Sequence, residues 1–424
     1  MIKLLLAILL AATSVSADPV QGRIDQTTDL RIVHVWGTPA EMGYAHGWLV
    51  GDDFVLGMKE LFAGLPPAMH GLLNMVRSWT VWIALSDAHR AELDGIYRGM
   101  RDRLGEDAMQ LPGVERPLDQ TDLLLWNGYD MFRSVGCSGF TAWGDRTTDG
   151  KTITARTLDL AVFSPHWVRT QILLVRHPNT GVATASVTPV CLLGTMTGIN
   201  ANGVCAFLHD GDGDEMTAVT ESERPLMLAL LDILQQATGS TAQQVAAKEL
   251  AAQGPFPYSY FIRIVGPQIG DAPPATTYRL DANGVSKATG GEQFSIVTNH
   301  STEQGDEPPR MRPGDSYRRY ARLHNACIDP QTRIDANAAW AALREVAPDH
   351  QSFMALHAVV VRPEAGELQV CIAGVNEDGR LETATKRPIT TLSLAQLFAH
   401  PKSAETVAEA TSPLATPVAR LDHR

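Results

Sequence analysis

The chain has 424 residues, of which 44% are hydrophobic and 19% are charged, a composition typical of a globular protein with a sizeable core. Its formal net charge of −12 leaves little basic surface for phosphates, so nucleic acid is not expected as a partner. The length fits two or three domains, or one large layered domain.

The first 17 residues have the pattern of a secretory signal peptide. Lys3 supplies a positive charge, residues 4–12 form an apolar run, and Val15-Ser16-Ala17 ends in the small residues that signal peptidase requires. The apolar run is too short to span a bilayer, which takes about 20 residues, although a buried N-terminal helix is an alternative. We therefore predict an exported protein, periplasmic or secreted, without a transmembrane segment, whose mature chain starts near Asp18.

Residues 18–136 have mainly helical patterns. The segment Gly37-Thr38-Pro39-Ala40-Glu41 predicts the start of a helix that continues through Leu49, and Ser86 is a typical N-cap for a second helix. A third, short helix is predicted over residues 120–129. This part of the chain is expected to form a helical N-terminal segment.

Beyond Gly136 the pattern changes to short strands separated by turns, with strong hairpin signals at Asp149-Gly150 and Asn202-Gly203. Strands are predicted at 138–144, 151–156, 170–176, 182–190, 193–199, 203–208, 259–265, 277–280, 293–298, 355–361 and 367–373. Helices are predicted at 226–236, 241–252, 318–326 and 336–346. Such an order predicts an α+β protein built as a four-layer αββα sandwich over 137–400, followed by a loose tail over 401–424.

Cys137 follows Gly136 directly, at the mouth of a predicted strand. The hairpin that follows brings Arg156 and Asp159 back toward this cysteine. A thiol is little ionised at neutral pH because its pKa is ~8.5, and a neighbouring cation lowers that pKa. If the Gly136–Cys137 bond is cut, the new α-amine, with a pKa of about 7.7–8.0, can act as base for its own thiol. On spacing alone, a structural cysteine beside an ordinary Arg–Asp pair explains the pattern equally well.

The run from Gly136 to Asp159 resembles the C45 family of autoproteolytic acyltransferases and hydrolases, within the cysteine N-terminal-nucleophile (Ntn) hydrolase superfamily. This family is related to isopenicillin N acyltransferase, acid ceramidase and choloylglycine hydrolase. Further similarities follow in the family's order over about residues 31–375. They are Gly37-Thr38-Pro39 with Glu41-Met42-Gly43, His46-Gly47, Thr197-Gly198-Ile199-Asn200 with Asn202-Gly203, Thr298-Asn299-His300, Ser316, Arg319, Arg322-Leu323, and His357 with Val359-Val360 and Pro363.

The resemblance implies a role for each matching residue near the proposed cut. Cys137 would be the nucleophile, first for self-cleavage after Gly136 and then for turnover. Arg156 and Asp159 would position and polarise its α-amine and thiolate. Residues 18–136 would become an α chain that stays packed on the catalytic β chain.

Two later residues also receive roles from the resemblance. Asn299 would donate its side-chain amide to the oxyanion of the tetrahedral intermediate, a donor whose loss typically costs about 10²–10³ in rate. Arg319 would hold this network, with its neighbour Arg318 as the alternative by one position.

The resemblance implies an amidohydrolase or acyltransferase that cleaves the amide bond of a small N-acyl compound through a thioester on Cys137. No cofactor or metal is implied. An ester or phospholipid deacylase, or an acyltransferase, would use the same site. A protein of a different class, an exported binding protein for a lipid or small acid with an inert Cys137, is a further alternative.

Other polar residues are not assigned to catalysis. His46 is expected to pack a helix, with pocket lining as the alternative, and His300 would point away from Asn299 if it lies on a strand. His357 fits a satisfied core histidine. The acidic stretch 209–215 lacks the spaced glutamate of an EF-hand, so a solvated loop is favoured over a calcium site.

The remaining cysteines and the tryptophans leave alternatives open. The count of cysteines is odd, so at least one thiol stays unpaired in an oxidising compartment. Four of them, Cys191, Cys205, Cys327 and Cys371, could form two disulfides in three ways. The tryptophans of the N-terminal segment are expected in a core or interface, or in an apolar acyl pocket, and they are Trp79, Trp82 and Trp126.

Overall fold

A computed structural model describes most of the chain between residues 20 and 399. The predicted signal peptide (1–17) and tail (401–424) lie outside the described residues. No helix among those described is long and apolar enough to cross a bilayer. The described ranges are 20–27, 29–66, 69, 71, 75–128, 135–162, 165–211, 224–253, 256, 258–288, 293–300, 315–328 and 332–399.

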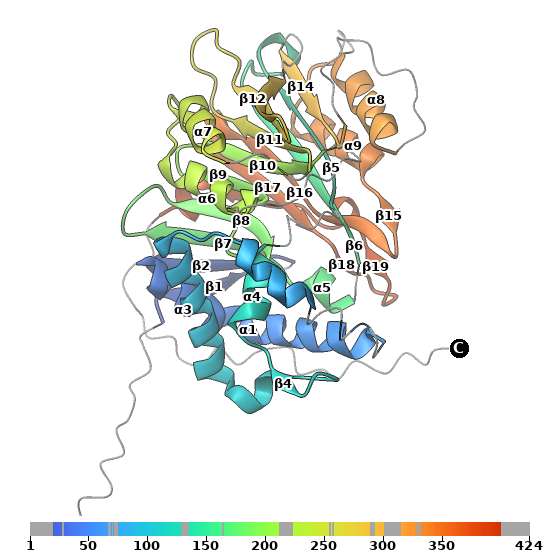
Figure 1. Ribbon diagram of the computed structural model, residues 1–424. Helices are drawn as coiled ribbons and strands as arrows, with labels where there is room; N and C mark the ends of the chain where they lie inside the picture. Colours follow the sequence, from blue (N-terminus) through green and yellow to red (C-terminus); the bar gives the residue numbers. More distant parts are fainter. Residues whose placement is uncertain are drawn as a thin grey trace, which may run out of the picture.

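Two large β-sheets form the centre of the protein (Figure 1). The first has nine strands in the order β1-β2-β7-β8-β9-β10-β11-β12-β13. Within it only β2 and β7 pair in parallel. Its strands are β1 (Gly22–Gln26), β2 (Arg31–Gly37), β7 (Gln171–Pro178), β8 (Thr184–Pro189), β9 (Thr197–Asn200), β10 (Cys205–Asp210), β11 (Tyr260–Val265), β12 (Ala275–Asp281) and β13 (Gly284–Ala288).

The second sheet has seven strands and is antiparallel throughout, in the order β14-β5-β6-β16-β17-β20 with β15 paired to β16. Its strands are β14 (Phe294–Val297), β5 (Val135–Ala142), β6 (Ile153–Ala161), β16 (Phe353–Arg362), β17 (Glu367–Ile372), β20 (Thr390–Ser393) and β15 (Asp349–His350).

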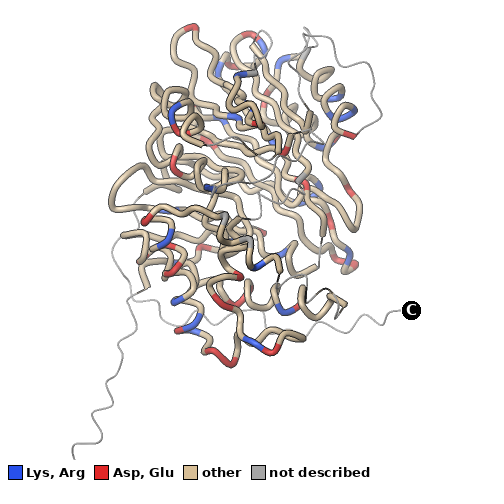
Figure 2. The backbone as a smooth tube through the Cα atoms, viewed as in Figure 1, with Lys and Arg blue, Asp and Glu red and all other residues tan. Residues whose placement is uncertain are grey.

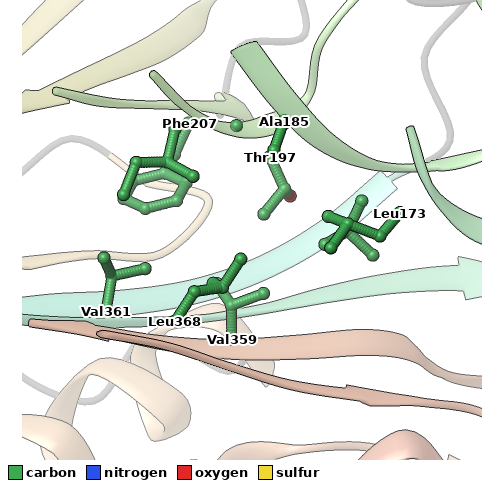
Figure 3. Close-up of a pocket in the computed structure, with 10 residues that line it drawn as sticks. Leu173, Ala185, Thr197, Phe207, Val359, Val361 and Leu368 are labelled. Atoms are coloured by element: carbon green, nitrogen blue, oxygen red, sulfur yellow. The ribbon is translucent and has the colours of Figure 1, made fainter. Parts of the chain in front are cut away.

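An apolar layer fills most of the space between the two sheets. Side chains of both sheets meet there because every second residue of a strand points to the same face. Figure 3 shows this layer around a narrow gap, with Leu173, Ala185, Thr197 and Phe207 on one side and Val359, Val361 and Leu368 on the other. The two sheets therefore share one core.

Helices cover the outer faces of both sheets (Figure 1). Against the nine-stranded sheet lie α6 (Leu226–Gln236) and α7 (Ala242–Ala251), and α8 (Asp315–Ile328) and α9 (Ala336–Val346) cover the other sheet. The predicted α+β sandwich of four layers is confirmed. The smaller helices and strands are α5 (Pro165–Arg169), α10 (Leu394–Leu397), η1 (Ser78–Trp82), η2 (Glu106–Met109), η4 (Gly144–Arg146), η5 (Pro363–Ala365), η6 (Ala384–Lys386), β3 (Gln110–Leu111), β4 (Arg116–Pro117), β18 (Gly374–Val375) and β19 (Leu381–Glu382).

The N-terminal segment contains the predicted helices and, in addition, strands that were not predicted. It does contain α1 (Pro39–Gly64), α3 (Asp87–Leu104) and α4 (Gln120–Asn127), and Ser86 caps α3 as predicted. It also supplies β1 and β2 to the nine-stranded sheet. The central residues of β2 are buried on both faces, so this strand lacks the polar–apolar alternation that identifies a half-exposed strand.

The two predicted hairpins are present. Gly150 (φ +74°) lies in the connection between β5 and β6, and Gly203 (φ +77°) lies between β9 and β10. Both adopt the left-handed backbone conformation that glycine tolerates best. Positively and negatively charged residues are interspersed along the described backbone (Figure 2).

Candidate active site

Cys137 lies on β5 just beyond the end of its neighbour β14. The last paired residues of these strands are Val297 and Gly139, so no strand residue pairs with Cys137 on that side. Two side chains take the place of the missing strand. The Cys137 N–H donates to Asn299 Oδ1 at 2.9 Å, and Arg319 Nη1 donates to the Cys137 carbonyl oxygen. Both backbone groups of the candidate nucleophile are thus held by side chains.

Asn299 is itself fixed on three sides. Its Nδ2 donates to the backbone carbonyl of Asp210 at 2.8 Å, and its backbone N–H donates to Ser316 Oγ at 2.8 Å. Its Oδ1 also accepts from Arg319 Nη2 at 2.7 Å. In this arrangement the Asn299 side chain binds the Cys137 backbone, and its role as an oxyanion donor stays a prediction.

The Cys137 thiol points to the interior and lies beside a guanidinium group. Arg156 Nη2 is 3.1 Å from Cys137 Sγ, and it also donates to the Leu208 carbonyl at 2.6 Å. Arg156 Nη1 donates to Thr197 Oγ1 at 2.6 Å and to the carbonyl of Met196. Burial raises the pKa of the Cys137 thiol to about 11, although Arg156 opposes this shift. With the Gly136–Cys137 bond intact, the thiol is therefore protonated at neutral pH.

Asp159 lies on the other face of β6 from Arg156, because the two residues are three positions apart on a strand. It pairs with Gly136 across the hairpin, and a Cβ placed on Gly136 would be 3.5 Å from Asp159 Oδ2. Burial raises the pKa of Asp159 to about 7, against the opposing attraction of Arg319. A group that gains and loses its proton near neutrality thus lies beside the bond before Cys137.

The structure places Arg319, not Arg318, at the site. Arg319 is 6% exposed; its Nη1 donates to Ser138 Oγ at 2.6 Å and lies 3.8 Å from Asp159 Oδ2. Its Nε donates to Asp315 at 2.6 Å, one helical turn earlier. The Arg318 side chain is 66% exposed and pairs only with Asp315 among the contacts of the described chain.

A chain of polar contacts behind the site, which includes Gln171, was not predicted. Thr197 Oγ1 lies 2.8 Å from His357 Nε2, and His357 Nδ1 lies 3.1 Å from Gln171 Oε1. A buried polar chain therefore runs from the thiol through Arg156 and Thr197 to the opposite sheet. Single threonine and glutamine residues on buried strands give no sequence signal, and only the resemblance drew attention to Thr197.

The residues not assigned to catalysis lie as follows. His357 is buried with both ring nitrogens paired, in accordance with a satisfied core histidine. His300 lies beyond the end of β14; its Nδ1 lies 2.8 Å from Ser316 Oγ, and its ring stacks on Tyr317. The acidic stretch 209–215 falls partly outside the described residues.

Trp126 is partly buried between apolar clusters, as expected for a core or interface residue, and the side chains of Trp79 and Trp82 lie outside the described part. All five cysteines are buried and free, so the structure contains none of the disulfide pairings that the sequence left open. Within the described ranges no group of three or more His, Cys, Asp or Glu side chains could hold a metal ion.

No family model matches the chain. An uncharacterized protein of Archaeoglobus fulgidus is 28% identical in an alignment 202 positions long, which covers 41% of this chain and 31% of that protein. The match thus spans less than a third of the relative's length.

Solved structures show weak similarity. An N-acylethanolamine-hydrolyzing acid amidase ortholog of Caenorhabditis elegans aligns over 54% of this chain and 93% of its own, with 15% identity and a TM-score of 0.39. A variant of the conjugated bile acid hydrolase of Clostridium perfringens aligns over 61% of this chain and 93% of its own, with 12% identity and a TM-score of 0.43. Penicillin V acylase of Agrobacterium tumefaciens aligns over 56% of this chain and 83% of its own, with 15% identity and a TM-score of 0.31. Scores below 0.5 do not establish a common fold, so any functional conclusion depends on the residues around Cys137.

Proposed function

We propose that this chain is an exported amide hydrolase of the N-terminal-nucleophile type, of the C45 kind that the sequence resembles. It cuts itself between Gly136 and Cys137 and then uses Cys137 to hydrolyse a small N-acyl compound. One observation carries the proposal: three separate side chains, of which Arg156 and Arg319 are buried, bind the thiol, the backbone nitrogen and the carbonyl oxygen of the same cysteine. A structural cysteine needs no such set of partners.

Self-cleavage would proceed through an acyl shift. The Cys137 sulfur attacks the Gly136 carbonyl carbon, the C–N bond breaks, and the nitrogen leaves as the α-amine, giving a thioester. Water then attacks the thioester and restores the thiol, leaving a carboxylate on Gly136. Asp159 lies beside Gly136 with a pKa of about 7, so it can accept a proton from this water at neutral pH.

Turnover repeats the same chemistry on a substrate. The α-amine of Cys137 replaces the amide nitrogen that Asn299 holds, and with a pKa of about 7.7–8.0 it serves as base for its own thiol. The sulfur attacks the substrate carbonyl, the amine product leaves, and water hydrolyses the acyl-thioester. Arg156, 3.1 Å from the sulfur, stabilises the thiolate.

The apolar cluster that contains Cys137 supports an acyl substrate. Cys137 belongs to a buried cluster that includes Leu158, Leu192, Met196 and Leu208. Such a surface suits the hydrocarbon part of an N-acyl compound. An ester deacylase or an acyltransferase would use the same groups and differ only in the leaving group or the acceptor.

The deciding experiment is the intact mass of the purified protein under denaturing conditions, with Cys137→Ala beside the wild type. The proposal requires two wild-type chains, the larger beginning at Cys137, and an uncut alanine variant. Hydrolysis of a panel of N-acyl amides, esters and acyl acceptors would then identify the reaction. A wild-type chain that stays whole and does not react with thiol-directed acylating agents would favour the binding protein with an inert cysteine.

A further inference from the structure

The turn between β8 and β9 carries an unusual backbone conformation close to the candidate site. Cys191 has φ +58°, in the left-handed region that few residues other than glycine, asparagine and aspartate adopt. It is completely buried. A conformation of this kind persists only when surrounding contacts hold it in place.

Side chains of the N-terminal segment provide these contacts. The Cys191 N–H donates to His46 Nε2 of α1 at 3.0 Å, and the Cys191 carbonyl accepts from Asn127 Nδ2 of α4 at 3.1 Å. The Asn127 side-chain oxygen also accepts the N–H of Leu193. His46 and Asn127 thus hold both sides of one peptide turn that belongs to the other predicted chain.

A third contact anchors the same turn. The Leu193 carbonyl accepts from Arg176 Nη2 at 2.7 Å, and Arg176 Nε donates to Glu92 of α3 at 2.8 Å. Both side chains of this ion pair are buried. Each of α1, α3 and α4 therefore contributes one side chain to fixing the turn.

The turn and Cys137 belong to the same part of the core. Leu192 lies in the same buried apolar cluster as Cys137 and Met196. The Met196 carbonyl and the Thr197 hydroxyl accept the hydrogen bonds of Arg156 Nη1. A shift of the turn would therefore move Leu192 of this cluster, and with it the Met196 carbonyl and Thr197 hydroxyl that orient Arg156 toward the sulfur.

We infer that His46 and Asn127 are positioning residues, which act through the turn at 190–193 to hold Arg156 and the apolar cluster beside the Cys137 thiol. The inference deepens the proposed function, because it gives the N-terminal segment a lasting part in the site after the cut. His46 accepts through Nε2, so its ring is neutral, and burial lowers its pKa to about 3. The contact therefore persists over the working pH range.

His46→Ala removes the acceptor, and His46→Gln offers an amide oxygen in its place. His89→Ala is the matched control, because His89 is also a buried histidine of the N-terminal segment that contacts the later chain, but its ring bonds Asp232 at 3.0 Å and not a residue of the turn. For cut protein we expect His46→Ala to lower kcat about 10- to 100-fold with little change in KM. His46→Gln should recover most of the loss, and His89→Ala should keep the wild-type kcat.

A second readout needs neither a substrate nor a cut chain. The rate of alkylation of Cys137 by iodoacetamide, followed residue by residue by mass spectrometry, gives a pH profile for this thiol. His46→Ala should shift the profile to higher pH because Arg156 is less well aimed, and His46→Gln should restore it. An unchanged profile in His46→Ala, or an equal shift in His89→Ala, would overturn the inference. If instead the chain proves uncut and inactive while the profile shifts as expected, the proposed function fails and the positioning role stands.

Discussion

The Asn299 side-chain oxygen accepts the N–H of Cys137 at 2.9 Å at the point where β14 stops pairing with β5. This contact replaces the backbone hydrogen bond that a neighbouring strand would make, and it comes from a single side chain. It can therefore hold the nitrogen both before the cut, as an amide, and after the cut, as an amine. The edge strand β14 thus ends at the position where, in the proposed reaction, the Cys137 nitrogen changes from an amide to an amine.

Replacing Asn299 with leucine should slow self-cleavage about 100-fold or more, because two buried backbone groups lose their partner and the Cys137 nitrogen is no longer held. The fraction of cut chain over time, measured by intact mass, tests this. Asn200→Leu is the control, because Asn200 is a buried asparagine whose amide likewise donates to backbone carbonyls, those of Leu234 and Ala237, and it does not bond Cys137. The two variants should lose similar stability, and only Asn299→Leu should cut slowly.

Arg319 and Arg318 offer a test within one helix. Arg319→Gln should lower the rate of self-cleavage and of turnover at least 100-fold, because the Cys137 carbonyl and Asn299 both lose a charged donor. Arg318→Gln should behave as wild type in both assays, because its side chain is 66% exposed. Equal losses in the two variants would mean that the effect comes from α8 as a whole and not from the contact with Cys137.

Asp159→Asn should stop the reaction at the thioester, because the amide cannot accept the proton of the attacking water. Hydroxylamine, which attacks thioesters directly, should then cut this variant and leave a hydroxamate on Gly136. Mass spectrometry identifies the product. Cys137→Ala, treated in the same way, should not be cut at this bond.

The two chains should stay together after the cut. β2 lies inside the nine-stranded sheet, and six of its residues pair with β7 across the boundary. The helices of the N-terminal segment also share a buried apolar core with Ile172 and Leu174 of β7, which belongs to the other chain. Native mass spectrometry or size exclusion should therefore give one species containing both chains, which separates only in denaturant. Release of the N-terminal chain under native conditions would contradict this and would also remove the turn contacts of His46.

Local sequence patterns predicted the residues of the site that lie on the β5–β6 hairpin. They did not predict the residues that reach Cys137 from distant parts of the chain. The hairpin placed Arg156 and Asp159 near Cys137, because the two strands are neighbours in sequence. Their spacing of three also implies opposite faces of the strand, which the hairpin argument overlooked. Asn299 and Arg319 lie 162 and 182 residues from Cys137, and only the resemblance indicated them. The end of β14 depends on where two strands diverge, which no local pattern records.

The pH dependence of stability gives a separate test of the environment of Asp159. In the folded protein this carboxyl keeps its proton up to about pH 7, whereas an unfolded aspartate releases it near pH 3.9. Between these values the folded state binds more protons, so the free energy of unfolding falls as the pH rises. Asp159→Asn removes this dependence. In the Cys137→Ala background, where neither protein is cut, the variant should gain stability over its parent from pH 4 to pH 7, by up to about 4 kcal/mol. Urea unfolding at several pH values measures the difference. Parallel stability curves would show that Asp159 is already ionised at low pH, and it would then be better suited to pairing with Arg319 than to proton transfer.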